Sequence, residues 1–150
     1  MKKITAIVLA VMMVFALCAC GGGGDNLTFV TGGEQGTYYA FGTVIAQQVS
    51  DKTDTAITAV SGNGSKANVE DLASGGAQLA FCQSDVMSYA YSGTNLFADS
   101  GAVKDFSVVA ALYMEQVQIV TMNPDIKTVA DLKGKNVSIG DSGSGVYFNA

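Results

Sequence analysis

Three loops rich in glycine and hydroxyl side chains are the part of this sequence best suited to holding a ligand. They span residues 31–39, 61–68 and 141–145, and each lies between a short apolar run and a stretch with helical spacing. Glycine lets a backbone approach a bound group closely, and the unpaired N–H groups that begin a helix favour an anion. Ligands of open α/β sheets bind beyond the carboxyl ends of parallel strands, so the loops predict one shared anion-binding cleft.

The residues expected to contact a ligand carry hydroxyl, amide or backbone N–H donors rather than charges. They are Gly33, Thr37, Tyr38, Tyr39, Asn63, Gly64, Ser65, Gln83, Ser84, Tyr113, Ser142, Ser144 and Gly145.

Several of these residues have a plainer alternative role. Asn63 and Ser65 are also suited to closing a turn and capping a helix, and Gln83 and Ser84 to forming a turn after a buried strand. Tyr113 and the neighbouring Glu115 are alternatively hinge structure. Asp85 could bind an ammonium group or act as an N-cap, and Asn68 ranks lower because it could simply satisfy its own helix.

The elements that must position these residues alternate between strand and helix patterns. Residues 27–30, 56–60 and 78–82 read as parallel strands, the last apolar enough to be buried on both faces. One helix begins near Tyr38, with an apolar face at Tyr38, Phe41, Val44, Ile45 and Val49. A second begins at a Ser65 cap and ends at the glycine pair 75–76. Residues 86–104 read as helix and loop.

The later part of the chain predicts a crossing into a second lobe. Residues 106–113 and 117–122 read as two strands around Met114, Glu115 and Gln116. A short helix starts at a capping box, Thr128 to Asp131, and stops at Gly134 before a strand at 137–139. The following helix is barely one turn long at residue 150, so we expect these residues to be the N-terminal part of a longer protein.

The first twenty residues predict export and lipid attachment. Lys2 and Lys3 precede an uncharged run from Ile4 to Leu17, which is typical of a signal sequence and shorter than the ~20 residues that span a bilayer. Residues 17–20 resemble the lipobox of bacterial lipoproteins. We therefore expect a signal peptide at 1–19, cleavage before Cys20, diacylglycerol on its sulfur and a tether at 20–26. The alternative is an ordinary signal that leaves Cys20 as a free thiol.

Composition argues against several other functions. The chain has eight basic and thirteen acidic side chains, no arginine and no histidine, which disfavours nucleic acid as a partner. Without histidine or a cysteine pair we expect no metal and no cofactor.

Cys82 reads as a small buried hydrophobe. Residues 140–143 resemble the nucleophile segment of serine proteases but lack a histidine base, so we expect no catalytic residue. The two nucleotide-binding motifs, G-x-G-x-x-G and the P-loop, are both incomplete in this sequence.

Five segments in succession carry a resemblance to a known family. They read TGGEQGTYY (31–39), SGNGSKAN (61–68), DLASGGAQLAFCQSD (71–85), AALYMEQVQIV (110–120) and IKTVADLKGKNVSIGDSGSG (126–145). This succession resembles the TAXI family, the solute-binding receptors of tripartite ATP-independent periplasmic (TRAP) transporters. The VADLKGK segment is shared with many two-lobed binding proteins. Its combination with the opening loop and QSD is more specific.

The resemblance implies an α/β, two-lobed, periplasmic-binding-protein-like (type II) fold that is truncated within its second lobe. Lobe I would span 27–110, and 111–150 would hold the crossover and the start of lobe II. Such a receptor captures a small carboxylate solute, an acidic amino acid such as glutamate or a dicarboxylate, and delivers it to an ion-gradient-driven membrane permease. It would be extracytoplasmic and anchored to the membrane through its lipid. The alternative is a ligand-sensing or enzymatic α/β domain of the same fold, such as a serine hydrolase.

Overall fold

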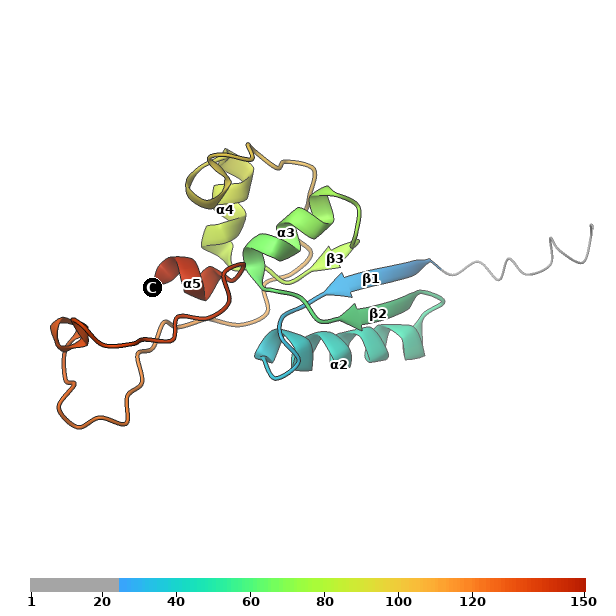
Figure 1. Cartoon of the computed structure of the whole chain (residues 1–150). Coiled ribbons are helices and arrows are strands. Elements are labelled where there is room, and N and C mark those ends of the chain that lie inside the picture. The colour runs from blue at the N-terminus through green and yellow to red at the C-terminus, as the bar shows by residue number, and fades with distance from the viewer. Residues whose placement is uncertain (1–24) are drawn as a thin grey trace, which may run out of the picture.

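The computed structural model describes residues 25–150, so the predicted signal sequence and the predicted lipidation at Cys20 lie outside the described residues. Helices and strands alternate over the first part of this range (Figure 1). The elements are β1 (Asn26–Val30), α2 (Thr37–Lys52), β2 (Ala56–Val60), α3 (Ser65–Ala73), β3 (Leu79–Ala80), α4 (Ser84–Ser92), the 3-10 turns η1 (Asn95–Phe97) and η2 (Val129–Leu132), and α5 (Gly145–Asn149). None of the helices within 25–150 has the length and apolarity needed to cross a membrane.

The three strands form one parallel sheet in the order β2-β1-β3. Strand β1 pairs with β2 along its whole length, from Asn26 opposite Ala56 to Val30 opposite Val60. It pairs with β3 over two residues only, Phe29 with Leu79 and Val30 with Ala80. An α/β fold was predicted and is confirmed, and this sheet is consistent with one lobe of a periplasmic-binding-protein-like fold. The parallel order gathers the carboxyl ends of all three strands at one edge.

Helix α2 covers one face of the sheet, while α3 and α4 lie on the other (Figure 1). The predicted apolar face of α2 is partly wrong, because Phe41 is 47% and Val44 59% exposed, whereas Gly42 and Ala46 are buried. The cause is that α2 approaches the sheet closely at Gly42. A Cβ on Gly42 would collide with the Thr31 side chain and lie 3.3 Å from the Phe81 ring. Contact through its smallest residue orients α2 toward the sheet.

Two apolar groups hold the body together. Under α3 and α4, the buried side chains of Val69, Val86, Ala90 and Phe97 form a core, and Tyr89, Leu96 and Phe106 pack around it. At the carboxyl end of the sheet, the Phe81 ring stacks between Phe29 and Tyr38, with centroid separations of 5.0 and 4.7 Å. The second group links the strand core directly to the first residues of α2.

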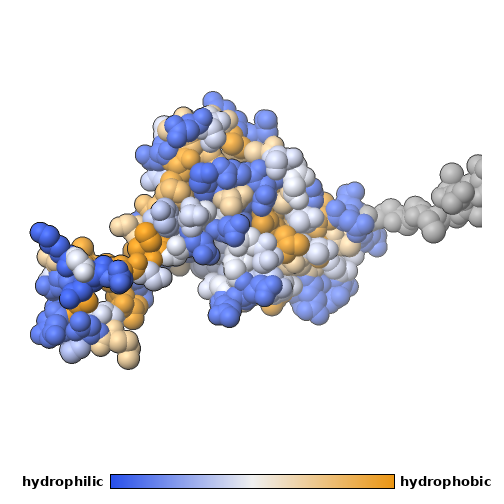
Figure 2. Space-filling view, viewed as in Figure 1, coloured by the Kyte–Doolittle hydropathy of each residue, from blue (hydrophilic) through white to orange (hydrophobic). Residues whose placement is uncertain are grey.

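Residues 107–140 leave this body as an arm that runs outward and then returns (Figure 1). The strands predicted at 106–113, 117–122 and 137–139 are wrong for this structure, since the described residues show no strand there. A strand needs a neighbour to take up its N–H and C=O groups, and none of the described strands lies alongside the arm. Apolar side chains are therefore left exposed along it, as Figure 2 shows.

One local prediction for the arm holds. The carboxylate of Asp131 accepts hydrogen bonds from the Lys127 N–H (3.1 Å), the Thr128 hydroxyl (2.9 Å) and the Thr128 N–H (2.9 Å), and these bonds lower its pKa. The short helical turn begins at this capping box and ends at Leu132, with Lys133 as its C-cap and Gly134, whose φ is +75°, directly after it. Its geometry is 3-10 rather than α. The division of the chain into two lobes at residue 110 stays a prediction.

Candidate functional site

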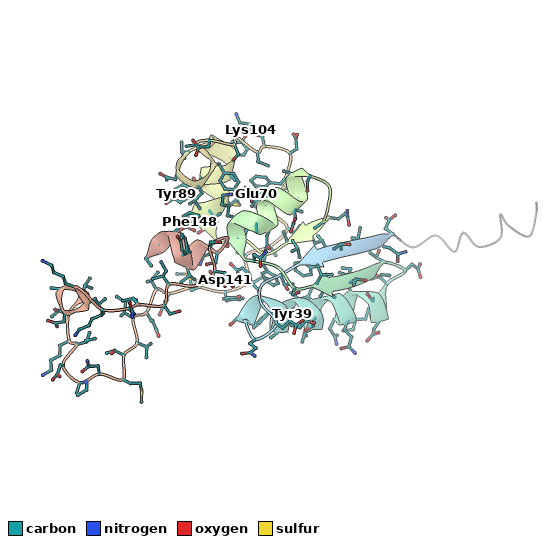
Figure 3. All side chains as sticks on the ribbon, viewed as in Figure 1. Tyr39, Glu70, Tyr89, Lys104, Asp141 and Phe148 are labelled. Atoms are coloured by element: carbon teal, nitrogen blue, oxygen red, sulfur yellow. The ribbon has the colours of Figure 1, made fainter. Side chains whose placement is uncertain are left out.

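The site lies at the carboxyl edge of the sheet, where three loops follow β1, β2 and β3. These loops span residues 31–36, 61–64 and 81–83, and we call them the loop edge. A fourth segment, residues 141–145, packs against them from the far end of the chain. Figure 3 places Asp141 where the arm rejoins the body and Tyr39 on the first turn of α2. The three glycine-rich loops predicted to meet, within residues 31–39, 61–68 and 141–145, therefore lie together at this edge, and the anion-binding cleft expected between them stays a prediction.

Asn68 connects the strands that carry the loop edge. Its side chain is buried completely, and its Nδ2 group donates to the carbonyl oxygens of Thr31 (2.6 Å) and Phe81 (2.8 Å). One amide of α3 thus fixes the ends of both β1 and β3. Sequence reasoning ranked Asn68 low. Its position inside a helix was the feature that could have identified it. Asparagine is unfavourable in a helix interior, so its presence there suggests that the side-chain amide forms a hydrogen bond outside the helix.

Ser65 does not cap α3 as predicted. The N-cap is Gly64, with φ +94°, and Ser65 is the first helical residue. Its buried hydroxyl accepts a hydrogen bond from the N–H of Gln83 (3.0 Å) and shares another with the Tyr38 hydroxyl (3.4 Å). The cap prediction fails because Gly64 supplies the turn, which leaves Ser65 to join α2, α3 and the loop after β3.

Tyr38 is the predicted contact that combines a fixed ring with a hydroxyl at the loop edge. Burial raises the pKa of this phenol, and the nearby Glu115 carboxylate raises it further. The hydroxyl is therefore a neutral donor at physiological pH. Tyr113 reaches α2 from the arm, where its ring contacts Phe41 with centroids 5.1 Å apart. Burial and Glu115 raise the pKa of Tyr113 as well.

The start of α3 already holds an oxygen acceptor. The Gly143 carbonyl oxygen accepts hydrogen bonds from the backbone N–H groups of Lys66 (3.0 Å) and Ala67 (3.4 Å). Gly64 makes the approach possible, because a Cβ there would lie 2.8 Å from the Ser144 Cα. A Cβ on Gly145 would fall on the Gln83 side-chain oxygen. The predicted anion position on α3 thus binds an oxygen, and that oxygen comes from the chain itself.

The remaining predicted contacts divide into two groups. Gln83 is the N-cap of α4 and Ser84 its first residue, while Ser144 caps α5 by accepting from Tyr147 N–H at 3.1 Å. Gly33, Thr37, Asn63 and Ser142 are exposed and Tyr39 is half-buried. Within residues 25–150, no side-chain hydrogen bond joins this second group to the first.

Asp85 takes a structural role. One carboxylate oxygen accepts from Val86 N–H at 2.8 Å, and the other accepts from the Asn149 amide at 2.9 Å. It lies in the first turn of α4 rather than at the N-cap. The carboxylate therefore ties α5 to α4.

The side chains at the loop edge offer hydrogen bonds, and their reactivity can be assessed residue by residue. Burial, followed by the charge of Asp85, raises the pKa of the Cys82 thiol to about 12, so it is not a nucleophile at neutral pH. Ser142 has no histidine to activate it anywhere in the sequence. Among the described residues, no three His, Cys, Asp or Glu side chains gather in a metal-binding group.

A comparison with known protein families decides the broader class. The model of the NMT1-like family matches residues 29–150, which is most of the chain and includes every loop of the site. The chain belongs to the NMT1-like family. Membership fits a solute-binding protein, and the three-stranded body of this NMT1-like protein fits one lobe of such a fold.

Proposed function

We propose that this NMT1-like protein is the extracytoplasmic receptor of a TRAP transporter, of the TAXI type. It captures a small carboxylate solute and delivers it to an ion-gradient-driven membrane permease. The solute class is an acidic amino acid, such as glutamate, or a dicarboxylate. Family membership supports a binding role, and the loop succession quoted above supports the TAXI type.

The observation that carries the proposal is the oxygen held by two α3 N–H groups at an edge where three β-α loops meet. A carboxylate oxygen is a stronger acceptor than a carbonyl for the same donors, and the helix dipole favours its charge. Lys66 is the cation in the first turn of α3. The Lys66 ammonium pairs with Glu70 one helical turn away. This arrangement supports recognition of the carboxylate by neutral donors.

Calorimetry with L-glutamate and succinate tests the proposal, with the diamine putrescine as a solute that lacks a carboxylate. Both acids should bind, and putrescine should not. Removing the Tyr38 hydroxyl with Tyr38→Phe should weaken binding by about ten- to a hundredfold if it bonds a carboxylate. Tyr89→Phe is the matched control, because Tyr89 packs beside the core of α3 and α4.

Two results would count against this function. One is failure of a wide panel of carboxylates to bind, and the other is a chemically altered solute recovered by mass spectrometry. The lipid anchor proposed at Cys20 is tested separately by feeding cells a fatty-acid analogue. The wild-type protein should be labelled and Cys20→Ser should not, and equal labelling of the two would contradict the anchor.

A further inference from the structure

We propose that the Glu115 carboxylate binds the ammonium group of the solute, which makes the receptor selective for α-amino acids over dicarboxylates that lack an amino group. This inference rests on the proposed function and narrows its solute class. Glu115 lies in the arm, and its side chain is exposed. The proposed function assigns the solute carboxylate to neutral donors, and Glu115 adds a position of opposite chemistry beside them.

Three groups around the loop edge show where the Glu115 carboxylate lies. Tyr38 reaches this edge from the first turn of α2, and Tyr113 contacts the same helix from the arm. The carboxylate faces both phenol hydroxyls. Burial raises the pKa of each phenol, and the hydrogen-bonding contact and charge of Glu115 raise it further. The same charge also raises the pKa of the Cys82 thiol, after the larger effects of burial and Asp85.

The Glu115 carboxylate has no cation beside it in the described part of the chain. Among residues 25–150, the ammonium–carboxylate ion pair is the one between Lys66 and Glu70. A carboxylate ion has about four lone-pair sites, so two phenol hydroxyls leave room for further donors. Its negative charge repels a second carboxylate placed beside it and attracts an ammonium. The position therefore fits a group that carries both positive charge and N–H donors.

The interior of the same edge also favours a solute that brings donors. The side-chain oxygens of Asn68 and Gln83 are buried and have no hydrogen-bond partner among the described residues. Gln83 is linked to Tyr38 through Ser65, whose hydroxyl accepts from the Gln83 N–H at 3.0 Å and bonds the Tyr38 hydroxyl at 3.4 Å. Buried polar atoms in folded proteins are normally paired. Acceptors without donors are therefore present here, and a second carboxylate on the solute would add more.

The two ends of an amino acid meet different groups in this arrangement. Its carboxylate takes the neutral donors of the loop edge, and its ammonium donates to Glu115. The ammonium thus supplies the hydrogen bonds that Glu115 otherwise takes from the phenols. The Tyr38 hydroxyl is then free to turn toward the solute carboxylate, because a hydroxyl rotates to suit its partner. A solute without an amino group offers no such exchange, and its binding is weaker for that reason.

Matched pairs of solutes isolate the contribution of the amino group. L-Glutamate differs from glutarate by that group alone, and L-aspartate differs from succinate in the same way. Calorimetry on the full chain should show an amino acid binding at least about tenfold more tightly than its partner acid. Glu115→Gln keeps the size of the side chain but removes its charge. It should weaken binding of the amino acid by about ten- to a hundredfold and leave the partner acid unchanged or bound more tightly.

Asp125→Asn is the matched control, because Asp125 is another exposed carboxylate of the arm. This variant should keep both affinities at their wild-type values. Thermal unfolding should give the same midpoint for wild type and for Glu115→Gln, since an exposed side chain contributes little to stability. A change confined to the amino acids therefore reports recognition rather than folding.

Two results would overturn the inference while leaving the receptor function intact. One is equal weakening of an amino acid and its partner acid by Glu115→Gln, which would show that Glu115 has a structural role. The other is a wild-type protein that binds each dicarboxylate as tightly as the matching amino acid. If no amino acid and no dicarboxylate binds, the proposed function fails and this inference fails with it.

Discussion

The body, residues 26–106, and the arm, residues 107–140, are built from similar amino acids but adopt different structures. Both contain runs of valine, isoleucine and alanine typical of strands. Val30 of the body is 3% exposed and paired on both sides, whereas Val109 of the arm is 84% exposed. The two regions differ in whether a neighbouring strand is present. A run of apolar residues favours burial, but its sequence does not specify which strand it will pair with. Residues with high strand propensity form a strand only where another strand is available to pair with them.

The largest expected difference between the body and the arm is in the rate at which a cysteine thiol in each region is alkylated. The Cys82 pKa is raised from 9.0 to about 12, chiefly by burial, so at pH 8 its thiolate fraction is roughly a thousandfold below that of an ordinary thiol. A thiol placed in the arm by Val120→Cys should react at the ordinary rate. Alkylation with iodoacetamide, followed by mass spectrometry of the peptides carrying each residue, measures both in one sample. Comparable rates would break the distinction between body and arm.

Truncation of a large side chain gives the next largest effect. Phe97 is fully buried in the core under α3 and α4, so Phe97→Ala should lower the free energy of unfolding by about 3–5 kcal/mol. In the arm, Val120 is 85% exposed, and Val120→Ala should change it by less than about 0.5 kcal/mol. Urea unfolding followed by circular dichroism compares the two. A loss above 1 kcal/mol at Val120, where about 0.5 is the surface norm, would show the arm to be packed.

A smaller effect is expected from an asparagine of each region. Asn68→Leu removes the donor shared by the Thr31 and Phe81 carbonyls and should cost about 1–3 kcal/mol of stability. Asn123, whose side chain accepts from the N–H of Asp125 on the exposed surface, is the control. Its replacement by leucine should be nearly neutral. If both substitutions cost the same, the clamp at the end of β1 and β3 is not a stabilising feature.

Local patterns allowed much of the body to be predicted. The β2 range and the start of β1 and α2 agree with expectation to within a residue, because alternation and turn glycines are local signals. Gly75, with φ +77°, ends α3 where a glycine pair indicated a stop. The buried side of α2 was less predictable. It depends on how closely Gly42 lets the helix approach Thr31, which is a tertiary fact.

The candidate site was predictable in its loops but not in its connections. Glycine and hydroxyl residues at strand ends marked the loop edge, and the structure gathers Tyr38, Gly64, Ser65 and Gln83 there. The bond from α3 to Gly143 joins residues far apart in sequence, and no local pattern specifies such a pair. The same holds for Glu115, whose charge reaches Tyr38 from the arm. Backbone acceptors are especially hard to anticipate, since every residue has one.

The stack of Tyr38 on Phe81 has an optical consequence. The sequence contains no tryptophan, so tyrosine dominates its absorption near 280 nm, and six tyrosines contribute. Near-ultraviolet circular dichroism arises from aromatic rings held in fixed packing. Tyr38 is held in this way, and its hydroxyl reaches Ser65 at the loop edge. Its spectrum therefore offers an intrinsic signal of events at that edge without an attached label, and Tyr38→Phe identifies its share.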